Sequence, residues 1–393
     1  METNSSALGA KSGRVRRYVH ERLSSLHPAY FAMSMATGIV SIACHLLGLR
    51  ELSAILFWIN VVAYVALWVA LAARVILFPK AFFADWKSHQ RSPGFFTSVA
   101  STCVLGTQFV LLRHAPGIGF GLWVAALILW SICTYAVFVS LSIREEKPSL
   151  ADGINGGWLV AVVATQAICV LGCSVLPDRI GDRNIALFFL TCFWLCGGML
   201  YIWMISLIFY RYTFFRFSPS DLMPPYWINM GAVAISTLAG TALVNAANGS
   251  VFMGSILPFV KGFTLLYWAT ATWWIPMLVV LGIWRHAMRS VAFAYDPLYW
   301  GLVFPFGMYC VCTYRLADVF DLPSLRWISR GFMVVALIAW MFTFFGLVTR
   351  FVYLALLAGR ALRRPRPTIE KTSSRFPALE NACTSQPSHG GSP

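Results

Sequence analysis

Charged side chains are scarce in this chain of 393 residues. Asp, Glu, Lys and Arg make up only 11% of the residues, and hydrophobic residues make up 59%. A typical soluble domain is about one quarter charged. Acidic residues are the rarest, with 15 in the whole chain. This composition excludes an ordinary soluble domain and predicts an integral membrane protein.

Carboxylates are missing from the central part of every long apolar segment. Ten segments are long enough to cross a hydrocarbon core of about 30 Å as helices, and their short connections leave no room for a soluble domain. Intramembrane Asp and Glu usually mark proton relays and cation sites, so their absence argues against a cation pump. The ten segments are predicted at 28–48, 53–78, 94–112, 118–143, 156–176, 185–210, 226–246, 262–284, 297–317 and 331–357.

The usual signatures of an enzyme are also missing. The chain has no P-loop, dinucleotide fingerprint or nucleophile elbow in a suitable context, so we expect no enzymatic activity and no cofactor. Its ten cysteines include no CxxC pair. Cys192 with Cys196 and Cys310 with Cys312 lie inside apolar segments without nearby His or acidic residues, which is typical of membrane packing and not of a thiolate or metal site.

The ten segments alternate between two kinds. Odd segments contain Gly, Ser, Thr, Asn and Gln, whereas even segments are almost uniformly bulky and apolar. In a bilayer, small and hydroxyl residues gain most at close helix contacts or around a wet cavity. The small and polar clusters recur at steps of roughly one hairpin, which is typical of transporter repeats. The sequence therefore predicts an all-α integral membrane protein with ten transmembrane helices, arranged as five helical hairpins around a central pore.

Helical spacing predicts which residues line that pore. On the first segment a small and polar stripe extends to His45 and shares one helix face. The alternative is that such faces are seams for close helix packing, but their restriction to odd segments favours a pore lining. The predicted lining residues are Ser34, Thr37, Gly38, Ser41, Ser101, Thr102, Thr165, Asn229, Ser236, Gly301 and Pro305.

The ninth segment contains the run WGLVFPFGMY, residues 300–309. Pro305 removes a backbone donor inside the helix, and Phe304 stands directly before it. Phe304 is either a buried ring beside a kink or a ring that closes a narrow conduit as a hydrophobic constriction. Near the end of the segment, Arg315 and Asp318 are three residues apart and could pair on one helix face, either as a structural tie at the membrane boundary or as an anion site.

The distribution of basic residues predicts the orientation. With the N-terminus in the cytoplasm, 22 of the 30 Lys and Arg residues lie on the cytoplasmic side, as the positive-inside rule expects. We therefore predict a protein of the inner (plasma) membrane with both termini in the cytoplasm, in contact with lipid and not with nucleic acid. Its predicted parts are a basic arm at 1–26, the transmembrane pore domain at 27–358 and a disordered tail at 359–393.

Three runs of the sequence resemble the tellurite-resistance and C4-dicarboxylate transporter family, which includes slow-type anion channels, malate permease and sulfite efflux pump. They are HPAYFAMSMATG at 27–38, WINMGAVAI at 227–235 and WGLVFPFGMY at 300–309. The resemblance implies five hairpins around a pore, anion transport, often a trimer, and a gating phenylalanine that maps onto Phe304. Ala36 stands where a second glycine is common, and Phe306 replaces a smaller residue.

These features lead to a functional hypothesis with two alternatives. We predict a channel or uniport-like permease for a small inorganic or organic anion, gated by Phe304. The first alternative is an ion-coupled secondary exporter of sulfite or a C4-dicarboxylate such as malate. The second is a membrane protein that detoxifies tellurite with its cysteines, although these lack an activating environment.

Overall fold

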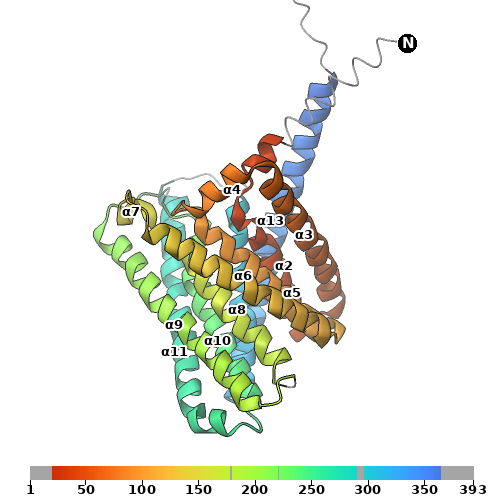
Figure 1. Cartoon of the computed structure of the whole chain (residues 1–393), viewed down its shortest axis with the longest axis vertical. Coiled ribbons are helices and arrows are strands. Elements are labelled where there is room, and N and C mark those ends of the chain that lie inside the picture. Colours follow the sequence, from red (N-terminus) through yellow and green to blue (C-terminus); the bar gives the residue numbers. More distant parts are fainter. Residues whose placement is uncertain (1–19, 178, 220, 290–295, 364–393) are drawn as a thin grey trace, which may run out of the picture.

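The computed structural model describes residues 20–177, 179–219, 221–289 and 296–363. Within these ranges the chain is helical and contains no strand. Figure 1 shows the long helices packed side by side in one bundle, with α13 extending beyond it at the end that carries α4 (Pro79–Trp86) and α7 (Leu150–Gly153). The predicted all-α membrane fold is confirmed.

Five helices form a closed inner ring. Each contacts the next one in the chain, and the last contacts the first. In four of them, between 72% and 83% of the most apolar stretch is buried within the protein. The predicted sorting of the odd segments to the inside is therefore correct. The inner helices are α2 (Ala32–Leu46), α5 (Phe96–Arg113), α8 (Val160–Val175), α10 (Ile228–Ala246) and α12 (Trp300–Val319).

Five helices surround this ring. Each packs against the inner helix that precedes it, which makes five hairpins. Only 17% to 50% of their most apolar stretch is buried, because their bulky side chains face outward, where a bilayer would cover them. The outer helices are α3 (Arg50–Leu77), α6 (Pro116–Ser142), α9 (Arg183–Phe214), α11 (Val251–Ile283), which continues as the π-turn η5 (Trp284–Met288), and α13 (Arg326–Arg363), which follows η7 (Pro323–Leu325).

Nine helices in the described part of the chain are long and apolar enough to cross a membrane. The remaining predicted span, the ninth at 297–317, corresponds to α12, which has 20 residues, includes Pro305 and Arg315, and closes the ring between α10 and α2. Ten crossings therefore remain a prediction, with nine supported by length and composition. α13 continues to Arg363, past the predicted start of the tail, and the basic arm up to residue 19 and the tail from residue 364 lie outside the described residues.

All five inner helices begin with the same local structure, a 3₁₀ turn. Four of the five turns carry proline at their first or second position, where the missing N–H costs nothing, and aromatic residues follow. Adjacent turns contact one another in a second closed ring. The inner helices therefore run in parallel, with their N-termini gathered at one end. The turns are η1 (Pro28–Phe31), η2 (Ser92–Phe95), η3 (Gly156–Leu159), η4 (Pro224–Trp227) and η6 (Pro297–Tyr299).

A repeated hydrogen bond joins each outer helix to the inner helix of the next hairpin. In four hairpins an aromatic side chain on the outer helix bonds a threonine hydroxyl, and in the third hairpin the indole of Trp194 donates to the carbonyl of Ser236. The fifth hairpin reaches back to the first and so closes the circle. The four hydroxyl pairs are Tyr64 with Thr102 at 2.9 Å, Trp130 with Thr165 at 2.8 Å, Trp268 with Thr313 at 3.0 Å and Trp340 with Thr37 at 3.0 Å.

Candidate functional site

Two cavities lie inside the ring. The N-terminal cavity, of about 480 Å³, is lined by the starts of all five inner helices. The C-terminal cavity, of about 330 Å³, is lined by the later turns of the same five helices. Representative residues of the first cavity are Met35, Thr97, Val160, Ile228 and Gly301, and of the second Ile39, Val104, Ala167, Ile235 and Met308.

Phe304 lies between the two cavities on α12. Gly301 lines the N-terminal cavity and Met308 lines the C-terminal cavity, and spacings of three and four residues place Phe304 on the same helix face. None of its surface is exposed. Phe304 is therefore a buried ring at the level between the residues of α12 that line the two cavities.

Glycines let α12 approach both of its neighbours in the ring at this level. A Cβ at Gly231 of α10 would lie 2.8 Å from Cγ of Pro305, and a Cβ at Gly307 would lie 2.9 Å from Cγ2 of Ile39 on α2. Both separations are shorter than a real Cβ contact, so neither site accepts a side chain without movement. α12 continues as a helix through Pro305, and this close packing holds it against both neighbouring inner helices at the level of Phe304.

Two of the residues predicted to line the pore on the first inner helix, Thr37 and Ser41, bond to outer helices. Thr37 accepts from Trp340, and the hydroxyl of Ser41 donates to the carbonyl of Ser53 at 2.8 Å. A Cβ at Gly38 would collide first with Cγ1 of Val104 on the inner helix α5, at 2.5 Å, and then with the amide of Asn60 on α3, at 2.8 Å. Thr37 and Ser41 thus satisfy hydrogen bonds between helices, and none of the four residues predicted on this helix is among the described linings of the two cavities.

The predicted residues on the other inner helices fall into two groups, those that bond or pack between helices and those that lie on the cavity side. Thr102 and Thr165 take part in the repeated bond, Asn229 donates to the hydroxyl of Tyr212 at 3.1 Å, and the Ser236 hydroxyl donates to its own helix at Ala232. Pro305 packs against α10, and Ser34 is fully buried. Gly301 is the one predicted residue among the described linings of the two cavities. Ser101 lies between Thr97 and Val104 at helical spacing, on the face that lines both cavities.

Most residues that line the two cavities were not predicted from the sequence, because they are apolar. On α2 the lining residues are Ala32, Met35, Ile39, Ile42 and Leu46. Their spacing of three or four residues is visible in the sequence, but an apolar stripe looks the same whether it faces lipid, another helix or a conduit.

The N-terminal cavity has a positive electrostatic environment. The N-termini of five parallel helices surround it, and each carries roughly half a positive charge from its macrodipole. Arg91 and Arg211 also line it, together with Asp152 and Asp221. Arg211 is held by the carbonyl of Ala151 at 2.7 Å and by the hydroxyl of Tyr226.

A buried ionic cluster lies beside this cavity. Asp85 bonds Arg74 and Arg91, each at 2.7 Å, and Arg91 also donates to the carbonyl of Leu26 at 3.1 Å. Arg74 and Asp85 are almost completely buried. One carboxylate between two guanidinium groups leaves a net positive charge near the mouth of the ring, which favours anions there.

The titration of His27 makes the stability of this end of the ring depend on pH, which can be tested. Its Nδ1 accepts from the N–H of Ala29 at 3.1 Å and caps η1. Burial, and then the charge of Arg91, lower the pKa of His27 from 6.5 to about 4. The unfolded chain therefore binds a proton that the folded chain does not, and stability is lost as the pH falls from about 6.5 towards 4.

We expect the melting temperature of the purified protein to fall between pH 7 and pH 5, and to fall less in His27→Asn. Asparagine keeps an acceptor for the cap but does not titrate. Burial also lowers the pKa of His89, so the difference between wild type and variant isolates His27. Asp221 stays ionised in this range, since hydrogen bonds from Ser218 and the charge of Arg211 outweigh its burial and lower its pKa. Equal losses in both proteins would contradict the assignment.

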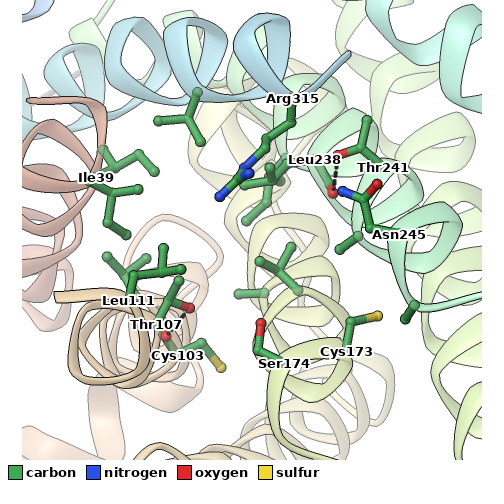
Figure 2. Close-up of a pocket in the computed structure, with 18 of the residues that line it drawn as sticks. Ile39, Cys103, Thr107, Leu111, Cys173, Ser174, Leu238, Thr241, Asn245 and Arg315 are labelled. Carbon is green, nitrogen blue, oxygen red and sulfur yellow. Dashed lines mark hydrogen bonds between the residues drawn. The ribbon is translucent and has the colours of Figure 1, made fainter. Parts of the chain in front are cut away.

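The predicted pair of Arg315 and Asp318 does not form. Asp318 instead bonds Arg326, at the start of α13, at 2.9 Å. Arg315 projects from α12 into the C-terminal cavity (Figure 2). The sequence prediction of a pair is therefore wrong, because the turn between α12 and α13 brings a second arginine closer to Asp318.

The cysteines form no recognisable centre. Nine are described and all are free thiols. Cys310 and Cys312 are buried, whereas Cys192 and Cys196 lie on the outer helix α9. Among the described residues, no group of three His, Cys, Asp or Glu side chains could hold a metal ion.

Comparison with known proteins identifies the family to which the chain belongs. Residues 25–348 match the family of voltage-dependent anion channels. The chain belongs to this family, and the resemblance drawn from the three sequence motifs is confirmed. It is therefore a multi-pass membrane protein of a family of transporters and channels.

The sequence identities with individual relatives are low or extend over only part of the chain. The chain is 24% identical over 333 residues to an uncharacterized transporter of Methanocaldococcus jannaschii, which covers 83% of this chain and 93% of that protein. It is 22% identical over 355 residues to a sulfite efflux pump of Trichophyton rubrum, which covers 82% of this chain and 90% of the pump. An uncharacterized membrane protein of Mycobacterium tuberculosis is 38% identical over 164 residues, 42% of this chain and 81% of that protein.

Proposed function

We propose that the chain is an anion channel or uniport-like permease for small inorganic or organic anions, and that the conduit is the axis of the inner ring. The observation that carries this proposal is the pair of cavities, both lined by all five inner helices and separated at Phe304. A conduit that is closed at one apolar level and open on both sides has the form of a gated pore.

Electrostatics support an anion as the permeating species. Five helix N-termini surround the N-terminal cavity. Arg91 and Arg211 also line it, but they pair with Asp85 and Asp221, so the excess positive potential comes from the helix ends. They raise the local concentration of anions without a buried charge at the constriction that would hold an anion too tightly to leave. The basic ends of the outer helices lie at the same end, which agrees with a cytoplasmic location for it and for both termini in the plasma membrane.

A second candidate is an ion-coupled exporter of sulfite. It is favoured by the similarity to sulfite efflux pumps, which extends over most of both chains. Malate and tellurite stay predictions from the family resemblance, as does assembly into a trimer.

Flux through the purified protein in liposomes tests the proposal. We expect anions such as chloride, nitrate and sulfite to move down an imposed membrane potential, and potassium not to move. Flux that follows an imposed proton gradient at zero potential would favour the coupled exporter. Liposomes as tight to all these anions as protein-free liposomes would exclude both.

A further inference from the structure

The C-terminal cavity contains a cation whose charge is not balanced by its neighbours. Arg315 is half-buried and its guanidinium group projects into the space between α2, α8 and α10 (Figure 2). The acid three residues later is bound to Arg326. No hydrogen bond or ion pair joins Arg315 to any residue of the described ranges. Its charge therefore faces the cavity.

The described residues around this cation include no carboxylate. Most of them are aliphatic, such as Ile39, Leu111 and Leu238. A cation in partly apolar surroundings is poorly solvated, so an opposite charge is held strongly there. The second arginine of the cavity, Arg183, donates to the carbonyl of Ala246 at 3.1 Å and so is already engaged.

Few other hydrogen-bond donors are directed to the same space. The hydroxyl groups of Thr107 and Thr241 donate to carbonyls of their own helices, at 2.9 and 2.8 Å. The carboxamide of Asn245 lies on the α10 side of the cavity (Figure 2). Ser174 of α8 also lines the cavity. Arg315 is therefore the charged donor best placed for a ligand, and Asn245 and Ser174 are neutral donors beside it.

Arg315 also opposes the field of the inner helices. All five helices end at this cavity, and their C-termini carry partial negative charge. An anion that moves away from the N-terminal cavity would meet an increasingly unfavourable potential there. One unpaired guanidinium group compensates for it at the level where the repulsion would be greatest.

We propose that the C-terminal cavity is an oxyanion-binding site, with Arg315 as its main ligand and Asn245 as a second donor. This inference rests on the proposed anion conduction. A guanidinium group binds two oxygen atoms of one ligand side by side. The site thus takes nitrate, sulfite or a carboxylate in preference to chloride, which offers a single spherical acceptor.

The test compares Arg315→Gln and Arg315→Lys with Arg113→Gln in liposomes. Arg113 lies at the same end of the ring, over the rings of Phe57 and Trp58, so its loss changes the surface charge equally outside the cavity. We expect Arg315→Gln to lower nitrate flux roughly tenfold, the value of a lost charged hydrogen bond, and to abolish the preference for nitrate over chloride. Arg315→Lys retains the flux but loses the preference, and Arg113→Gln behaves as wild type.

A binding measurement separates this inference from the proposed function. In detergent, at constant ionic strength, nitrate is expected to raise the melting temperature of wild type and Arg113→Gln more than chloride does, and to have no such effect on Arg315→Gln. An unchanged nitrate preference in Arg315→Gln, in flux or in melting, would overturn the site. Wild-type liposomes without anion flux would overturn the proposed function, while the melting experiment would still decide the site.

Discussion

Replacement of Phe304 by Ala is expected to raise anion flux by roughly tenfold or more. A tenfold rise requires the free-energy barrier to ion passage to fall by only about 1.4 kcal/mol. Phe304 is fully buried between two cavities that every inner helix lines. Removal of its ring would join them into one conduit and weaken the hydrophobic barrier to hydrated ions. Electrical recording in planar bilayers measures this directly.

The neighbouring ring provides the matched control. Phe306 is also almost buried but packs on Trp227 and Phe332, at centroid distances of 4.7 and 6.3 Å. Both alanine variants should lose stability, by about 3–5 kcal/mol if these sites behave as ordinary cores. Only Phe304→Ala should conduct more, and Phe304→Leu, which keeps most of the volume, should stay close to wild type. Equal currents in Phe304→Ala and wild type would reduce Phe304 to a packing residue.

Among single glycine-to-alanine substitutions in the described turns, we expect Gly156→Ala to lower the stability of the fold most. A Cβ at Gly156 would lie 2.5 Å from the carbonyl oxygen of Pro225 and 2.7 Å from Cα of Tyr226. These are backbone atoms of the turn η4, so no side-chain rotation relieves the contact. Since η3 and η4 are neighbours in the ring of 3₁₀ turns, the third and fourth hairpins would have to separate. We expect a cost at or above the usual 1–3 kcal/mol of overpacking.

Thermal melting in detergent, followed by size-exclusion chromatography, measures this loss. Gly254→Ala on α11 is the control, because a Cβ there meets no atom within 4 Å. We expect Gly254→Ala to melt as wild type does and Gly156→Ala to melt much earlier or not to accumulate. Equal melting of the two variants would mean that the turns can separate freely and that their ring does not stabilise the bundle.

The prediction of five hairpins succeeded for a physical reason. An outer helix must present bulky apolar side chains over most of its surface, whereas an inner helix can contain Thr37 or Thr165 because a neighbouring helix supplies a partner. This difference is a property of composition and can be read along the chain. The same property misled the search for the lining, because a polar group with a partner between helices is not available to a conduit.

For the ninth segment, too, some features could be predicted from the sequence and others could not. Its motif and the position of Phe304 could be predicted, and α12 places that residue on the face that lines both cavities. The expected pair of Arg315 and Asp318 failed, because Arg326 follows after a turn whose path the sequence does not specify. The runs HPAYF, SPGFF, PPYWI and DPLYW begin four of the inner helices, but the meeting of their 3₁₀ turns in one ring depends on helix packing.

The sequence by itself determined that this protein crosses a membrane, that its helices alternate between inside and outside, and which family it belongs to. Those properties depend on the number, order and composition of apolar segments, which the linear chain contains in full. Only the tertiary structure decided that threonines of four inner helices bond to outer helices, and that Arg315 faces the C-terminal cavity instead of pairing with Asp318. A helix can turn any of its faces inward, and the choice is made by the hydrogen bonds and close contacts that neighbouring helices offer.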